Sequence, residues 1–120
     1  MKQSPNLNLL TIEGFLTHSP EYHPDKGKLL TFSIAHNMSE DIPGLDNPMY
    51  LDVRVTGISE DTANAIVKGH KVRVTGKLQC KSWQGKDDRK ERYFFVYVPY
   101  ASQLELLNKP RVDSHELQPA

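Results

Sequence analysis

The chain has 120 residues, of which 15 are basic and 15 are acidic, so its formal net charge at neutral pH is zero. This length suits one domain with its own core and is too short for two ordinary domains. The sequence has no apolar run long enough to span a bilayer, and its first residues lack the apolar stretch of a signal peptide, so we expect a cytoplasmic protein without a membrane partner.

The first half of the chain predicts three strands separated by turn-rich loops. Residues 7–17 form the first, with Leu10, Ile12 and Leu16 on one face and a bulge or bend at Gly14. A loop with two prolines covers residues 18–28, and residues 29–37 then alternate as the second strand. After an acidic loop over residues 38–48, residues 49–57 alternate as a half-buried third strand.

One short helix is predicted next. Ser59 is a suitable N-cap, Glu60 and Asp61 occupy the first turn, and Lys68 and Gly69 are typical of a basic last turn and its end. Residues 70–83 return to strand alternation. Lys71, Arg73, Lys77, Lys81 and Trp83 share one face of this fourth strand, provided that Gly76 introduces no bulge.

Residues 84–88 predict a hairpin turn, and residues 92–99 predict the closing strand. Five strands with one helix between the third and fourth indicate an all-β fold with one short helix, the five-stranded Greek-key barrel of the OB-fold. We expect this domain to cover residues 1–107 and a flexible tail to cover residues 108–120, where apolar residues are scarce.

The motifs of enzymes and metal sites are missing from the sequence. The single cysteine, Cys80, has no partner for a disulfide, and the five histidines lack metal-ligand spacing. There is no glycine-rich phosphate loop and no Ser-His-Asp arrangement. We therefore expect no catalytic residue, no metal and no cofactor.

Charge is distributed unevenly despite the zero total. Residues 71–92 contain eight basic side chains and three acidic ones, a surplus of five, and the rest of the chain is correspondingly acidic. Such polarity allows one side of a neutral molecule to attract a polyanion.

Trp83 lies at the root of this basic hairpin. Its shared parity with Lys77 and Lys81 favours a surface position, where an indole stacks on nucleobases while nearby cations neutralise phosphates. The alternative is that Trp83 fills the core. The cations of the hairpin are equally compatible with a solvated turn, and Asp87, Asp88 and Glu91 partly cancel them. The aromatic strand that follows places Tyr93, Phe94, Phe95 and Tyr97 on alternating faces, and parity alone leaves open which of them point outward.

Three segments resemble the single-stranded DNA-binding proteins (SSB) of bacteria and phages. They are "LLTIEGFLTHSPEY…GKLLTFSIAHN", "YLDVRVTGISEDTANAIVKGHKVRVTGKLQCKSW" and "RYFFVYV". The resemblance covers residues 7–107 and implies an OB-fold that assembles into homotetramers, or dimers, and binds single strands at the nucleoid during replication, repair and recombination. It also implies base stacking by Trp83 and Tyr50 and backbone contacts by Lys68 and Lys81. For Tyr50 a cross-strand pair is the alternative.

The chain departs from this family at three places. Thr56 stands at a position that is usually aromatic, and Glu40, or at best Met38, stands where many relatives have tryptophan. Each lost stacking platform is worth about 1–3 kcal/mol per base, so we expect weaker binding. The terminal residues HELQPA lack the acidic tip with which relatives recruit replication proteins, so recruitment by such a tip is not expected.

The sequence thus predicts a non-enzymatic protein that binds single-stranded DNA as a homo-oligomer. The predicted DNA-binding residues are Trp83, Tyr50, Lys81, Lys77, Arg73, Lys68, Lys86, Arg89 and Arg92. The alternative is an OB module of the primosomal replication-restart kind, which acts mainly through protein contacts. The missing aromatics and the neutral total charge favour that alternative.

Overall fold

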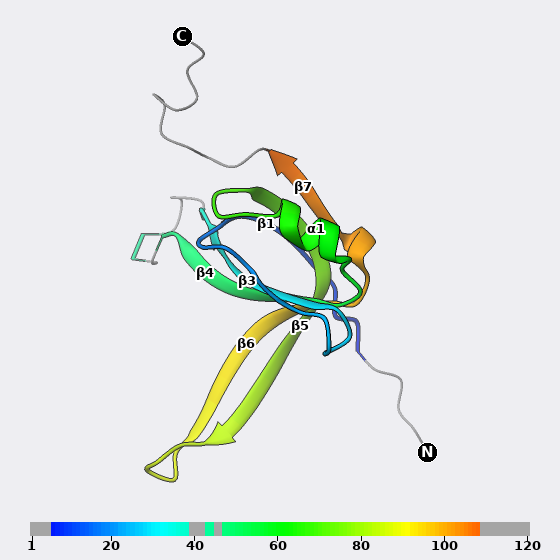
Figure 1. Ribbon diagram of the computed structural model, residues 1–120. Helices are drawn as coiled ribbons and strands as arrows, with labels where there is room; N and C mark the ends of the chain where they lie inside the picture. Colours follow the sequence, from blue (N-terminus) through cyan, green and yellow to red (C-terminus); the bar gives the residue numbers. More distant parts are fainter. Residues whose placement is uncertain (1–5, 39–42, 45–46, 109–120) are drawn as a thin grey trace.

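A computed structural model of the chain describes residues 6–38, 43–44 and 47–108. In this part, seven strands and two short helices follow one another (Figure 1). They are β1 (Leu10–Leu16), β2 (Glu21–His23), β3 (Leu29–His36), β4 (Met49–Val55), α1 (Glu60–Ala65), β5 (Lys71–Gln84), β6 (Lys90–Val98), the 3-10 helix η1 (Ala101–Gln103) and β7 (Leu104–Asn108).

The strands form one sheet that closes into a barrel. The order β1-β3-β4-β6-β5 returns to β1, because β1 pairs with β5 as well as with β3. The β4–β6 pair is parallel and the other pairs are antiparallel. The predicted bend at Gly14 lies where β1 changes partners: a Cβ there would lie 2.8 Å from the carbonyl oxygen of Ala35. Glycine therefore allows the close approach, and the β1–β5 register continues through it without a bulge.

The predicted number of strands is wrong, because the described part of the chain has seven rather than five. The five predicted strands close the barrel, while β2 pairs with β3 and β7 pairs with β5. The strand β2 lies in the predicted loop of residues 18–28, where the Tyr22 hydroxyl donates a hydrogen bond of 2.6 Å to the Ile58 carbonyl. The strand β7 depends on a partner distant in sequence. The strand β2 forms a local hairpin with β3, but its three residues are too few to show the alternation that predicts a strand.

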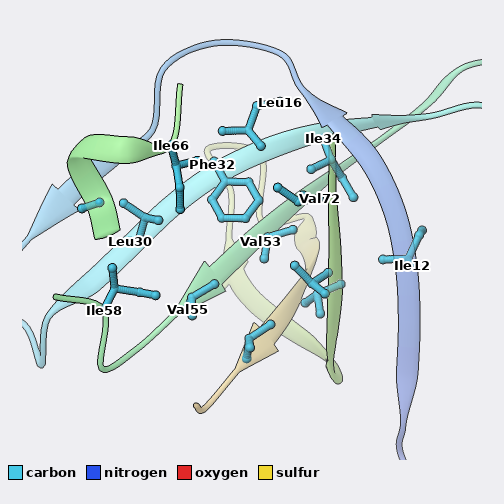
Figure 2. Close-up of a cluster of buried hydrophobic side chains, with 14 residues drawn as sticks. Ile12, Leu16, Leu30, Phe32, Ile34, Val53, Val55, Ile58, Ile66 and Val72 are labelled. Carbon is cyan, nitrogen blue, oxygen red and sulfur yellow. The ribbon is translucent and has the colours of Figure 1, made fainter. Parts of the chain in front are cut away.

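The core consists of the inward side chains of the barrel strands together with Ile58, Ala63 and Ile66 from the α1 region (Figure 2). Of the side chains that alternation places on the inner faces, Ile12, Leu16, Leu30, Phe32, Ile34, Val53, Val55, Val72 and Val74 are buried, while Leu10 and Leu51 are partly buried against the core. Alternation therefore predicted the inner face correctly in each barrel strand that it was used for.

The helix α1 begins as predicted and ends earlier. The Ser59 hydroxyl accepts a hydrogen bond of 3.2 Å from the Thr62 amide, which makes Ser59 the N-cap. The helix ends at Ala65 because Ile66 becomes extended and is buried, and the Val67 amide donates to Nδ1 of His70 instead of continuing the helix. The predicted basic last turn is therefore wrong, and Lys68 lies in the connection to β5.

The strand β5 belongs to the barrel in its first half and leaves it in its second. Up to Gly76 it pairs with β1, and from Lys77 onward it pairs only with β6. The hairpin from Leu78 to Val96, here called the arm, projects away from the barrel (Figure 1). Gly76 introduces no register shift in these ladders. Leu78 and Cys80 keep the parity of the buried valines but are exposed, because the arm extends beyond the core.

The predicted tail of residues 108–120 lies outside the described residues, apart from Asn108 at the end of β7. No helix in the described ranges is long and apolar enough to cross a membrane.

Candidate nucleic-acid interface

Alternate side chains of β4, β5 and β6 lie on one solvent-facing surface, here called the outer face. In the arm, Gln79 lies opposite Phe95 and Lys81 lies opposite Tyr93. The parallel β4–β6 pair brings Asp52 level with Phe95. Directly paired residues share a face of the sheet. The outer face therefore includes Tyr50, Asp52, Arg54, Lys77, Gln79, Lys81, Trp83, Tyr93, Phe95 and Tyr97.

Trp83 lies near the end of β5, opposite Glu91, with 46% of its surface exposed. It is therefore close to the tip of the arm, and the prediction that it lies at the root of the hairpin is wrong. It lines an open hollow together with Ser82, Gln84, Asp88 and Lys90. The indole lies outside the barrel core, and its exposed part is accessible to a ligand.

Tyr50 begins the outer face of β4 and is 65% exposed. It pairs across strands with Ala35 of β3, so only a methyl group lies opposite its ring. A small neighbour leaves a tyrosine ring free for a ligand rather than for an aromatic cross-strand pair.

The predicted basic residues divide into three groups. Lys77 and Lys81 lie on the outer face beside the aromatic side chains, and both are exposed. Lys86 and Arg89 are exposed on the turn of the arm. The structure does not bring the remaining three to this surface: Arg92 pairs with Ser82 on the opposite face of the arm, Lys68 follows α1, and Arg73 lies in the barrel half of β5.

Arg73 is bound to two carboxylates. Its guanidinium donates to Oε2 of Glu13 at 2.7 Å and to Oε2 of Glu105 at 3.2 Å. The hydrogen bond and charge of Arg73 lower the pKa of Glu13, and those of Glu13 raise the pKa of Arg73. A guanidinium that already holds two anions is less available to a phosphate.

Sequence reasoning passed over Arg54, which lies on the outer face. Its guanidinium carbon lies 4.2 Å from the ring centroid of Phe95 and 5.6 Å from that of Tyr93, and the two rings stack with centroids 5.6 Å apart. No ion pair engages Arg54 within the described residues. The parity of β4 placed Arg54 outward, but only the parallel β4–β6 register shows that it lies over aromatic rings.

The same register decides which aromatic side chains of β6 point outward. Tyr93, Phe95 and Tyr97 share the outer face with Lys77 and Lys81, whereas Phe94 lies on the opposite face of the arm and is 52% exposed. Thr56, which stands where the family usually has an aromatic residue, donates a hydrogen bond of 3.1 Å to the carbonyl of Pro99. Glu40 lies outside the described residues.

Comparison with known proteins agrees with this fold. The model of the "Single-strand binding protein family" matches residues 7–104. A single-stranded DNA-binding protein of Borreliella burgdorferi (strain B31) is 32% identical over 92 residues, which are 72% of this chain and 62% of that relative. The chain therefore spans less than two thirds of the length of this relative.

A solved structure shows the same architecture. The SSB of Plasmodium falciparum, in complex with single-stranded DNA, superposes with a TM-score of 0.71 at 20% identity, over 89% of this chain and 100% of that chain. This likeness confirms the predicted OB-fold. The proteins of the matched family bind DNA without catalysing a reaction. With the family model covering most of its length, the chain belongs to the single-strand binding protein family.

Proposed function

We propose that this protein binds and protects single-stranded DNA of any sequence during replication, repair and recombination, in the cytoplasm at the nucleoid. The observation that carries the proposal is the accessible indole of Trp83 on a face that also presents Lys77 and Lys81. Every base has a π face, so stacking on an indole tolerates any sequence, while the lysines neutralise the phosphates on either side.

The other outer-face side chains extend this surface toward the barrel. Tyr50 adds a second exposed ring, and Arg54 adds a cation that no carboxylate neutralises within the described residues. Lys86 and Arg89 add charge at the tip of the arm. Arg73, Lys68 and Arg92 are secondary contacts in this proposal, because they lie away from the outer face.

We expect the protein to act as a homo-oligomer, a tetramer or a dimer. Leu78 and Phe94 are 43% and 52% exposed on the face of the arm opposite to Trp83, which supports contact with a further copy. Several linked barrels hold one strand more tightly than one barrel, because each bound barrel raises the effective concentration of the next. Replication proteins are further candidate partners. Neither the fold nor the relatives found favour the alternative of a primosomal protein-interaction module.

The test is a titration of labelled oligo-dT, followed by anisotropy at two salt concentrations. We expect binding that weakens with salt, because each phosphate contact on a single strand contributes about −0.7 to the slope of log K against log salt. Trp83→Ala should weaken binding by about 1–3 kcal/mol, the value of one stacked base.

Tyr100→Ala is the matched control. Tyr100 is an exposed aromatic residue, 66% accessible, but it lies outside the outer face, between β6 and η1. Its removal should leave the affinity unchanged. A protein that does not bind oligo-dT even at low salt, or a Trp83→Ala variant that binds like the wild type, would contradict the proposal.

A further inference from the structure

A cleft of about 390 Å³ lies on the outer face, where the arm meets the barrel. We call it the aromatic cleft. It is lined by apolar or aromatic side chains and by two polar ones: Leu29, Phe95, Tyr97, Arg54 and Gln79. The registers of β4, β5 and β6 bring these side chains together, because Gln79 pairs with Phe95 and Arg54 pairs with Tyr97. The volume falls within the range of about 300–1,000 Å³ that is usual for ligand clefts.

Tyr97 lies between two cations in this cleft. The register places its ring level with Arg54 of β4 on one side and with Lys77 of β5 on the other. No ion pair engages either cation in the part of the chain that the structure describes. A ring flanked by two such cations suits a ligand that has a flat base between two phosphates, as every nucleotide of a strand has.

Arg54 is held by the aromatic side chains beside it. Its guanidinium carbon lies 4.2 Å from the ring centroid of Phe95, and Phe95 in turn stacks on Tyr93. Stacking engages the face of the guanidinium, whereas its five N–H donors lie in the plane. The position of Arg54 is therefore fixed while its plane can still donate to a phosphate.

The aromatic cleft also lies beside the position where the family usually has an aromatic residue. Thr56 stands there, and its hydroxyl oxygen is 3.4 Å from that of Tyr97. The Tyr97 ring of β6 thus reaches the neighbourhood of Thr56 on β4. A ring from the adjacent strand can supply the stacking platform that position 56 lacks.

The aromatic cleft is distinct from the place of Trp83. Gln79 and Trp83 are four residues apart on β5, so their Cα atoms are about 13 Å apart. Trp83 lines another hollow nearer the tip of the arm. Both places lie on the outer face, so one bound strand can contact the two in succession.

We propose that the aromatic cleft is a second base-binding site, in which one base packs against Tyr97 while Arg54 and Lys77 bind the phosphates on either side of it. This inference rests on the proposed binding of single-stranded DNA. The site accepts any base, because stacking uses the π face that all bases share.

The test compares two strands of about twelve nucleotides at low salt, oligo-dT and a strand of the same length that carries no bases. Tyr97→Leu keeps an apolar side chain on the sheet and removes the ring. It should weaken binding of oligo-dT about tenfold, as expected for the loss of one stacked base, and leave the affinity for the abasic strand unchanged.

Tyr100→Leu is the matched control, because it makes the same exchange at an exposed ring outside the outer face. Both of its affinities should equal those of the wild type. Arg54→Gln tests the phosphate contact separately. It should reduce the slope of log K against log salt by about 0.7, whereas Tyr97→Leu should leave that slope unchanged.

Cross-linking of the wild type provides a measurement that does not depend on the folding of a variant. Oligo-dT with one thymine replaced by 5-iodouracil forms a covalent bond to an adjacent aromatic side chain on irradiation. Since oligo-dT binds in any register, the label samples every base site. Mass spectrometry of the peptides should locate cross-links at Tyr97 or Phe95 in addition to Trp83.

The outcomes separate the two proposals. A Tyr97→Leu variant that binds oligo-dT like the wild type overturns the second base site and leaves single-strand binding intact. Cross-links at Trp83 without any at Tyr97 or Phe95 do the same, and an unchanged salt slope in Arg54→Gln overturns the phosphate contact. A wild type that binds neither strand overturns both proposals.

Discussion

At the scale of single residues, the partners of a side chain decide its role more than its type does. Arg73 and Arg54 are both arginines on barrel strands, yet Arg73 is held by Glu13 and Glu105 while Arg54 lies over Phe95 and Tyr93. Glu13 precedes Arg73 by 60 residues in the chain, and Phe95 follows Arg54 by 41. Sequence parity selected Arg73 as a DNA contact and passed over Arg54, because neither set of partners is local.

The ion pair of Glu13 and Arg73 predicts a pH-dependent stability. Arg73 lowers the folded-state pKa of Glu13 below its ordinary value of 4.5. A lowered pKa contributes stability above the unfolded-state value, and that stability is lost as the pH falls through the folded-state value. Glu13→Gln should therefore unfold at lower urea than the wild type at pH 7, and the gap should close on acidification below 4.5.

Urea midpoints at neutral pH and at about pH 3 check this prediction. Glu21→Gln is the control, because the Glu21 side chain is 77% exposed and has no arginine or lysine partner within the described residues. Its midpoint should match that of the wild type at both pH values. A Glu13→Gln gap that stays constant with pH would show that the ion pair contributes no differential stability.

At the scale of elements, β5 belongs to both the barrel and the arm, and its pairing with β1 ends at Gly76. A Cβ at this residue would lie 2.2 Å from the carbonyl oxygen of Tyr97, a backbone atom of the neighbouring strand. No side chain fits there unless the two strands separate. The position of Trp83 on the arm thus depends on a glycine seven residues earlier in the same strand.

Gly76→Ala should destabilise the fold by about 3 kcal/mol, the upper end of the usual cost of overpacking, because the clash involves backbone atoms that cannot rotate away. Gly85→Ala in the turn of the arm is the matched control. Its new Cβ would meet the flexible Glu91 side chain at 3.2 Å, so we expect a much smaller effect. Thermal or urea unfolding of the two variants measures the difference, and equal destabilisation would contradict this role of Gly76.

At the scale of the whole molecule, a net charge of zero is compatible with binding a polyanion because the charges are separated. The arm carries five basic and three acidic side chains, with Lys77 at its base, whereas Lys71 and Arg73 in the barrel half of β5 pair with glutamates of β1 and β7. The local field at the arm, rather than the total charge, governs attraction of a DNA strand.

The proposed assembly predicts the mass in solution. Light scattering should give a multiple of the protomer mass of 13.7 kDa, twofold or fourfold, and a long oligo-dT should add its own mass to that assembly. The expectation follows from the weak hold of one barrel with few stacking residues and from the gain that linked barrels provide. A mass of 13.7 kDa both with and without DNA would contradict a homo-oligomer.

The sequence by itself determined the barrel strands, their inward faces and the N-cap of the helix, because alternation and capping depend on residues close together in the chain. It also predicted an accessible Trp83 beside Lys77 and Lys81. The strand β2, a local hairpin with β3, was missed because three residues are too few to show alternation. Only the tertiary structure decided that β7 exists, that the arm leaves the core after Gly76, where the pairing with β1 ends, that Arg73 is held by glutamates, and that Arg54 lies over Phe95 and Tyr93. Each of these depends on pairing between strands far apart in the chain, and a register between distant strands is set by the packing of the whole barrel.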